Sequence, residues 1–444
     1  MATNTQYWVW LGTSLGYGSH AIKPLLERFG DAEGVFNASP DALSGIPYLS
    51  SAERRLLLTH DLTRAEEVAN YAFHGGIRIL SIAEEEYPSA LREIPNPPTV
   101  LYVKGEIPEW NRLPCIGVVG ARAMSYYGAE AACEISYDLA RMGCVTVSGM
   151  ALGIDGAVAA ATLAAGGKTV AVLGSGIDRI YPAEHKALYH AIVDGGGAVI
   201  TEFPPYEGAD GFHFPIRNRI ISGLSRAVIL VEGEATSGAM ITARYAKKHD
   251  RSVFAVPGKI GDKNSEAPHL LLKSDAKLLT CADDVYDAFR EEYFSTMNPF
   301  ALLPKVSLHV EAILREYGVT VGKEKVREKK LLNGEKTSVP KSGVIGKIRS
   351  VFGGESKDTR DGDDPRKKSK EEYRACLDGE RRGILSKTAY AIYEKLNYET
   401  PVHPDEIELD SVGADVIVAE LVTMEVLGCV VAEAGGHYLK NEKE

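Results

Sequence analysis

The sequence lacks several features that would each have placed it in a narrow class of protein. It contains no run of about 18 uncharged apolar residues, so no membrane-spanning helix is expected. Its first residues show no basic segment followed by a long apolar core, which argues against a secretory leader. Its six cysteines include no C-x-x-C pair, which argues against a disulfide framework and a zinc site. We therefore expect a cytoplasmic protein with reduced thiols and no bound metal.

The sequence also lacks a net positive charge, because its formal charge is −11. Non-specific binding to nucleic acid depends on lysine and arginine, so the total discourages such a partner. The charge is uneven, however. Residues 321–375 contain 16 lysines and arginines against 10 acidic residues, which leaves the remainder more acidic still. Any phosphate site must therefore be local.

The length of 444 residues exceeds that of one usual domain. Residues 1–70 predict short helices joined by tight turns at Gly16-Tyr17-Gly18 and Gly45-Ile46-Pro47, the pattern of a helix-hairpin-helix domain. Such turns can offer backbone amides to a phosphate. Helical hairpins also require them for purely structural reasons, so both interpretations stay open.

Residues 71–300 predict an α/β domain with a doubly wound, Rossmann-like parallel sheet. Six short apolar runs alternate with helix-length segments, and most end in glycine. Continuous β-branched runs indicate strands buried on both faces. The stretch before Leu113 is expected to add short strands to this sheet. The six runs are residues 115–120, 144–149, 169–174, 198–203, 227–233 and 252–258.

Beyond Phe300 the composition changes twice. Residues 301–383 are charged and poor in large apolar residues, which predicts a disordered linker. Residues 384–444 predict three helices and a hairpin turning at Gly435-Gly436, the pattern of a winged-helix domain. The last helix carries Asp415, Glu420 and Glu425 but no lysine or arginine. We expect it to contact protein rather than DNA.

Ligands of open α/β sheets bind at the carboxyl ends of the strands. The first such loop, residues 117–128, contains small residues and Arg122, whose guanidinium can grip an anion through two hydrogen bonds. A dinucleotide site would need G-x-G-x-x-G here and an acidic residue after the second strand. The loop lacks the third glycine, and the second strand ends in Ser148-Gly149. No cofactor is therefore expected.

A second cationic cluster, Arg217, Asn218 and Arg219, lies at the start of an apolar helix. We expect it to face the same edge of the sheet as Arg122. Aromatic residues near these loops can stack on bases, although each can equally belong to the core. They are Tyr126, Tyr127, Tyr181, Phe212 and Phe214.

Six ordered motifs carry a resemblance to a known family: GARAMSYYG, SGMALGID, GSGIDRIYP, TEFPP, FPIRNRIISGLS and VEGEATSGAMITARYA followed by VFAVPG. The chain resembles the DNA-processing protein A (DprA/Smf) family. The resemblance implies a homodimeric, non-enzymatic single-stranded DNA-binding protein of natural transformation, which protects incoming DNA and helps load the RecA recombinase. It also implies a DNA-binding set consisting of Gly120, Arg122, Ser125, Gly128, Arg217, Asn218, Arg219, Ser237, Gly238 and Thr242.

Four positions depart from the family pattern: Ala121, His185, His269 and Asp275. The loop with His269 and Asp275 is expected to contribute less, or differently, to a phosphate pocket. An alternative function is that of a nucleotide phosphoribohydrolase, but VEGEATSGAMITA lacks the Gly-Gly and the glutamate of its PGGxGTxxE loop. Moreover, no nucleophile-base set is evident among the candidate polar side chains, Asp155, Glu202, Glu232, His185 and His213. A third interpretation is a structural adaptor for a recombinase that does not bind DNA.

Overall fold

The computed structural model describes residues 3–302 and 307–321, the single positions 378, 382 and 385, and, with short gaps, residues 387–441. Six helices come first. Three of them, α3, α4 and α5, begin with a side-chain cap: the side chains of Asp31, Ser39 and Ser50 each accept a backbone N–H of the helix that follows. The helices are α1 (Asn4–Ser14), α2 (Ile22–Phe29), α3 (Ala32–Phe36), α4 (Pro40–Leu43), α5 (Ser51–Leu57) and α6 (Thr63–His74).

The first glycine turn is already occupied by the protein's own groups. The Gly16 amide donates to Oε1 of Glu53 at 3.0 Å, and the Gly18 carbonyl accepts from Nδ2 of Asn96 at 2.9 Å. A Cβ on Gly18 would lie 3.3 Å from Nε of Arg219. These contacts favour the structural interpretation of this turn over the phosphate-binding one.

A nine-stranded sheet has the order β1-β2-β6-β5-β4-β3-β7-β8-β9. All six predicted runs form strands, and β3 to β9 run parallel, as predicted. The expected additional strands are β1 and β2, which join antiparallel. The strands are β1 (Arg78–Ser81), β2 (Val100–Gly105), β3 (Cys115–Val119), β4 (Val145–Ser148), β5 (Thr169–Val172), β6 (Ala198–Thr201), β7 (Ala227–Leu230), β8 (Ser252–Ala255) and β9 (Lys277–Leu278).

Both faces of the sheet are buried, which explains the continuous apolar runs. In β3, Ile116 and Val118 belong to one core cluster, whereas Cys115 and Val119 belong to the other. The same alternation recurs in the neighbouring strands. Burial raises the pKa of the Cys115, Cys133 and Cys144 thiols to about 12, so these cysteines are unreactive core residues.

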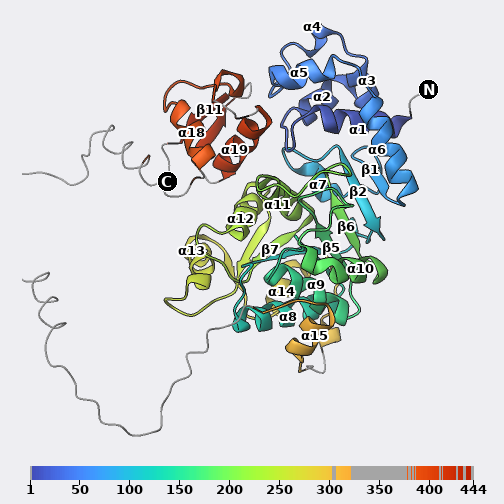
Figure 1. The fold of residues 1–444 in the computed structure, drawn as a ribbon. Helices are drawn as coiled ribbons and strands as arrows, with labels where there is room; N and C mark the ends of the chain where they lie inside the picture. Colours follow the sequence, from blue (N-terminus) through green and yellow to red (C-terminus); the bar gives the residue numbers. More distant parts are fainter. Residues whose placement is uncertain are drawn as a thin grey trace, which may run out of the picture. The chain divides into compact units, whose positions relative to one another are not determined.

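Helices cover the two faces (Figure 1). On one face lie α8 (Tyr126–Arg141), α9 (Ile154–Ala164) and α10 (Lys186–Asp194), and on the other lie α11 (His213–Leu224) and α12 (Gly238–Lys248). The loops after the neighbouring strands β3 and β7 therefore diverge to opposite faces, which opens a crevice between them. The remaining elements of the unit are α7 (Ser89–Glu93), η1 (Ala183–His185), η2 (Lys263–Ser265), α13 (Glu266–Ser274), α14 (Asp283–Phe289) and η3 (Pro299–Leu302).

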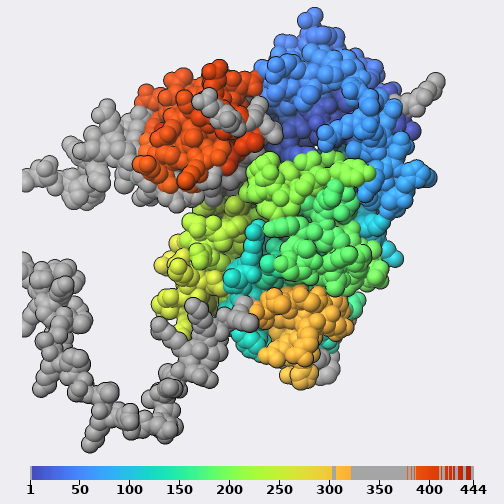
Figure 2. Space-filling view, in the orientation of Figure 1, coloured from blue at the N-terminus to red at the C-terminus, as the bar shows by residue number. Residues whose placement is uncertain are grey.

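The linker was predicted to begin at residue 301, but a packed helix follows that position. Residues 307–321 contain helix α15 (Val310–Glu316), whose Val310 and Leu314 are buried in the cluster that includes α8 and α9. The space-filling view shows this segment, in orange, in continuous contact with the α/β unit (Figure 2). The i, i+4 spacing of the two apolar residues gives the helix one buried side. Of the rest of the predicted linker, residues 303–306 and nearly all of 322–383 lie outside the described residues.

The C-terminal residues form α18 (Lys387–Lys395), η4 (Pro404–Glu406), α19 (Ala414–Val426) and an antiparallel pair, β10 (Val430–Glu433) and β11 (His437–Lys440). They enclose a small core of their own, whereas the predicted Gly435-Gly436 turn lies outside the described residues. Among the described residues, no helix is both long enough and apolar enough to cross a bilayer.

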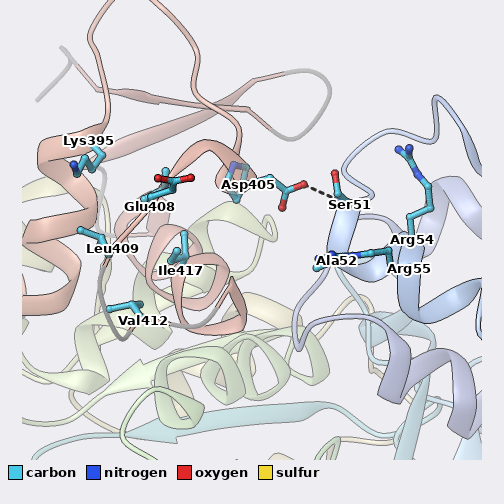
Figure 3. A pocket seen from close by; sticks show the side chains of 12 residues that line it. Ser51, Ala52, Arg54, Arg55, Lys395, Asp405, Glu408, Leu409, Val412 and Ile417 are labelled. Carbon is cyan, nitrogen blue, oxygen red and sulfur yellow. Dashed lines mark hydrogen bonds between the residues drawn. The ribbon is translucent and has the colours of Figure 1, made fainter.

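Two acidic residues of the C-terminal elements contact earlier helices of the same chain, α5 and α12. Oδ2 of Asp405 accepts the Ser51 amide at the start of α5 at 2.9 Å, where a carboxylate complements the helix dipole. Oε1 of Glu425 lies 3.1 Å from Nζ of Lys248. Figure 3 shows the cavity of about 910 Å³ beside the first contact, lined by Arg54, Arg55 and Lys395 among others.

Candidate functional site

A pocket of about 730 Å³ lies at the carboxyl ends of the parallel strands. The loops after β3, β4, β5, β6, β7 and β8 all contribute to it, as expected for a doubly wound sheet. Seven of the ten predicted site residues line it. They are Gly120, Arg122, Arg217, Asn218, Ser237, Gly238 and Thr242.

Arg122 is the exposed cation of the pocket. Its guanidinium lies 5.2 Å from the centre of the Phe214 ring. Within the part of the chain that the structure describes, this guanidinium has neither a hydrogen bond nor an ion pair. Phe214 also contacts Tyr181 at 5.5 Å between ring centres, and both rings line the pocket. A guanidinium without a hydrogen bond or ion pair, lying over an aromatic ring, can bind an anion that is attached to a flat group.

The loop that carries Arg122 is fixed by close packing against the start of α9. A Cβ on Gly120 would lie 2.6 Å from Ile154, and one on Gly153 would lie 2.3 Å from the Ala121 carbonyl. The Ile154 amide donates to that carbonyl at 3.1 Å. The glycine at 120 is thus required for strand-to-helix packing, and it positions Arg122 indirectly.

Arg217 provides a buried charge in the lining of the pocket. It is 3% exposed and donates to the Val172 carbonyl. Burial lowers its pKa to about 10, and the nearby Asp155 carboxylate opposes that shift. Burial likewise raises the pKa of Asp155, against the effect of Arg217 and of the Gly149 and Ala151 amides. Arg217 therefore remains charged at neutral pH.

The start of α12 forms the opposite wall. Asn218 donates to the Gly238 carbonyl at 3.1 Å and so fixes this helix end against α11. No side chain caps the helix at Ser237, and the Ser237 hydroxyl has no hydrogen-bond partner among the described residues. The space beside Gly238 is open. The first amides of a helix lack intrahelical acceptors and favour an anion, so this wall complements the two arginines.

Ser125 and Gly128 do not line the pocket, contrary to expectation. Glu232, at the end of β7, accepts the Ser125 amide at 3.0 Å and also the Ser125 hydroxyl. A Cβ on Gly128 would lie 2.2 Å from the Glu232 carboxylate. The N-terminus of α8 is thus occupied by the protein's own Glu232 carboxylate, whereas, among the described residues, no side chain caps the N-terminus of α12.

Arg219 also lies away from the pocket. Its side chain is 0% exposed and donates through Nη2 to Oε2 of Glu202 at 2.5 Å. Burial raises the pKa of Glu202, and Arg219 opposes this shift. Of the three residues expected to face one edge of the sheet together, Arg217 and Asn218 line the pocket, whereas Arg219 stabilises the core between α11 and β6.

The departures from the family pattern lie outside the pocket lining, except for Ala121. His185 is buried against the Met150 carbonyl, and His269 lies against the Gly258 carbonyl. Asp275 pairs with Lys247 on the surface. Of the predicted stacking residues, Tyr126, Tyr127 and Phe212 do not line the pocket. No group of three or more potential metal-ligating side chains is found in the described part of the chain.

Sequence reasoning missed four polar lining residues or their roles: Asp155, Glu234, Thr236 and Asn264. Asp155 was noted near a loop but not as the partner of Arg217. Asn264 donates to the Ala123 carbonyl at 3.1 Å and lies 3.4 Å from Glu232. It thus links the loop after β8 to the Arg122 loop. Asn264 lies in a polar segment without hydrophobic periodicity, so the sequence did not indicate that it would line the pocket.

Replacement of Arg219 by alanine tests the core role. The variant leaves the buried Glu202 carboxylate without its cation, so we expect the free energy of unfolding to fall by about 3–5 kcal/mol in chemical denaturation. The double variant Arg219→Met, Glu202→Leu removes both charges and is expected to recover most of that loss. An unchanged free energy of unfolding in Arg219→Ala would contradict the assignment.

Comparison with known proteins identifies the family. Residues 78–290 match the family model of DNA recombination-mediator protein A. The chain is 38% identical over 231 residues to the DNA processing protein DprA of Bacillus subtilis, covering 51% of this chain and 75% of that protein. It is 42% identical over 209 residues to DprA of Streptococcus pneumoniae, covering 47% and 73%.

A solved structure shows the same relationship. The crystal structure of DNA processing protein A from Streptococcus pneumoniae superposes with a TM-score of 0.55 at 34% identity, covering 64% of this chain and 98% of that chain. The agreement of sequence and fold leads to one conclusion: this chain belongs to the DNA recombination-mediator protein A family.

Proposed function

We propose that this protein binds single-stranded DNA in the pocket between Arg122 and the start of α12. The observation that carries the proposal is the Arg122 guanidinium over the Phe214 ring, which in turn contacts the Tyr181 ring, with no hydrogen bond or ion pair to this guanidinium among the described residues. A nucleotide offers an anionic phosphate next to a flat base, which matches this pair of features. Only unpaired bases expose their faces for such stacking, so a single strand fits better than a duplex.

The proposal extends to the process that the strand enters. A recombination mediator hands single-stranded DNA to a recombinase, and the family description supports that role. We propose that the protein acts in the cytoplasm during natural transformation, protecting incoming DNA and loading RecA onto it. This proposal differs from that of an adaptor that binds RecA but not DNA. Such an adaptor would not need the pocket, so loss of DNA binding on mutation of the pocket separates the two.

We propose binding without catalysis. Two carboxylates near the pocket are engaged with backbone amides: Asp155 accepts the Gly149 amide at 2.8 Å, and Glu232 accepts the Ser125 amide at 3.0 Å. A nucleotide phosphoribohydrolase would have to use the exposed Glu234, which also lines the pocket, as the base that abstracts a proton. The loop that carries Glu234 lacks the Gly-Gly and the terminal glutamate of the PGGxGTxxE loop of those enzymes.

Arg122→Ala tests the DNA site directly. A hydrogen bond to a charged group contributes about 1.5–3 kcal/mol, so we expect roughly ten- to hundredfold weaker binding of a labelled oligothymidylate in fluorescence anisotropy. The slope of log K against log salt should also become shallower, because one phosphate contact is lost. Arg112→Ala is the matched control, because Arg112 is exposed and pairs with Glu109. Equal affinity of parent and Arg122→Ala would contradict the proposal.

We further propose that the protein is a homodimer and that the β9 edge of the sheet forms its interface. β9 pairs on one side only, with β8. Exposed apolar side chains gather on this part of the chain: Ile260 after β8 is 93% exposed, Leu270 in α13 is 48% exposed, and Leu278 in β9 is 53% exposed. An exposed edge with apolar neighbours favours pairing with a second copy. Two pockets in one dimer would raise the avidity for one strand.

Leu278→Asp is expected to shift the protein from dimer to monomer in size-exclusion chromatography with light scattering, because a charge would have to be buried at the edge. Phe294→Asp is the control, because Phe294 is 80% exposed and lies elsewhere in the sequence. A dimer that persists in Leu278→Asp, or a parent protein that is monomeric at the same concentration, would refute this interface.

A further inference from the structure

A second group of exposed aromatic and arginine side chains lies beside the pocket but outside its lining. Tyr206, in the loop after β6, is 59% exposed. Its ring lies 4.5 Å from that of Tyr71 in α6, and the Arg179 guanidinium lies 6.0 Å from its centre. Arg179 comes from the loop after β5, and its side chain is 57% exposed. Three separate segments thus present one aromatic surface with a cation at its side.

The backbone at Tyr206 is strained, although its ring is largely exposed. Its φ is +72°, in the left-handed region that bulky residues rarely occupy. Such a conformation costs on the order of 1–3 kcal/mol and persists only where its surroundings enforce it. Here the Tyr206 amide donates to Oδ1 of Asp178 at 2.9 Å, and the Gly176 amide donates to the Glu207 carbonyl at 2.9 Å.

These contacts tie the loops after β5 and β6 together. A Cβ on Gly176 would lie 2.6 Å from the Pro204 carbonyl, so the glycine permits the close approach. The exposed ring is therefore held in a fixed position by contacts within these two loops. Strain of this kind is concentrated where a protein presents a side chain to a ligand.

The same two loops reach the pocket. Tyr181 in the first loop, and Ala209 and Gly211 in the second, line it. Arg179 is two residues from Tyr181, so their Cα atoms lie at most about 7 Å apart. A strand that leaves the pocket along Tyr181 therefore meets Arg179 and Tyr206 next.

The charges of this surface are balanced. Arg179 lies 3.6 Å from the Asp178 carboxylate, and Arg64 lies 3.9 Å from that of Glu207. Net attraction of phosphates is therefore small here. Binding at this surface depends on the ring faces, and stacking on an aromatic ring tolerates any base. Its contribution should consequently not depend on salt, in contrast to that of Arg122.

We propose that Tyr206, supported by Arg179 and Tyr71, is a second subsite that stacks a nucleobase of the strand whose phosphate occupies the pocket. The subsite rests on the proposed DNA-binding function. It extends the path of the strand from the sheet edge toward the N-terminal helix α6, and it sets a minimum length of strand that binds with full affinity.

The test compares oligothymidylates of about four and about sixteen nucleotides, the range of site sizes of single-strand binders, in fluorescence anisotropy with the full chain. Glycine tolerates a positive φ, so Tyr206→Gly removes the ring and keeps the loop conformation. We expect it to bind the longer oligomer roughly five- to tenfold or more weakly, with the short oligomer and the salt slope unchanged. Tyr206→Phe keeps the ring and should bind both as the parent does. Phe73→Ala is the matched control, because Phe73 is 80% exposed on the same helix as Tyr71.

Two results would overturn the subsite: parental affinity of Tyr206→Gly for the longer oligomer, or a loss in Tyr206→Phe or Phe73→Ala equal to that in Tyr206→Gly. Arg122→Ala separates this from failure of the proposed function. If Arg122→Ala binds both oligomers as the parent does, the DNA site in the pocket is refuted, and the subsite with it. If Arg122→Ala weakens both and Tyr206→Gly weakens neither, the subsite alone is refuted.

Discussion

The buried Arg217 guanidinium is the charge around which the pocket is arranged. A cation with 3% exposure requires compensation, and Asp155 supplies it from the first turn of α9. That carboxylate is itself fixed by the Gly149 amide at 2.8 Å. A Cβ on Gly149 would lie 2.0 Å from Arg217, so the end of β4 can approach only as glycine. The electrostatic attraction between Arg217 and Asp155 thus links α11, α9 and the end of β4 at the pocket.

Two other carboxylates near this edge of the sheet also bind the protein's own groups. Glu202 compensates Arg219 within the core, and Glu232 fills the N-terminus of α8. As a consequence, only some of the described charged and polar groups near the sheet edge are free of internal partners. Arg122 and the uncapped start of α12 remain available to a ligand, whereas the remaining charges hold the loops in place. This division explains how a protein with a formal charge of −11 can keep a local cationic pocket, the one that we propose for phosphate.

The sheet could be predicted from the sequence because strands buried on both faces leave a pattern of short, continuous apolar runs. The pocket could be predicted in outline, because ligands of such sheets bind at the glycine-closed strand ends. The three-residue run Arg217, Asn218 and Arg219 was the error. Residues two apart on a helix point about 200° away from one another, so Arg217 and Arg219 cannot face one ligand. That geometry was available from the sequence.

Other features could not be predicted. Ser125 and Gly128 lie in the expected loop, but only the fold brings Glu232 to them from more than a hundred residues away. The end of the ordered unit was misplaced because α15 is short and lies in a charged segment. The charged composition of that segment predicted disorder, and its two buried apolar residues were too few to indicate a packed helix. Tyr206 gave no signal either, since a positive φ at a tyrosine depends on contacts with Asp178 in another loop.

The central claim is that a phosphate of single-stranded DNA binds between Arg122 and the start of α12. The most direct measurement is a crystal structure of the protein with a short oligothymidylate. The account predicts a phosphate within hydrogen-bonding distance of the Arg122 guanidinium and of the Gly238 or Ala239 amide, with the neighbouring base against Phe214 or Tyr181. A strand bound at another surface, with neither Arg122 nor the start of α12 in contact with a phosphate, would contradict it.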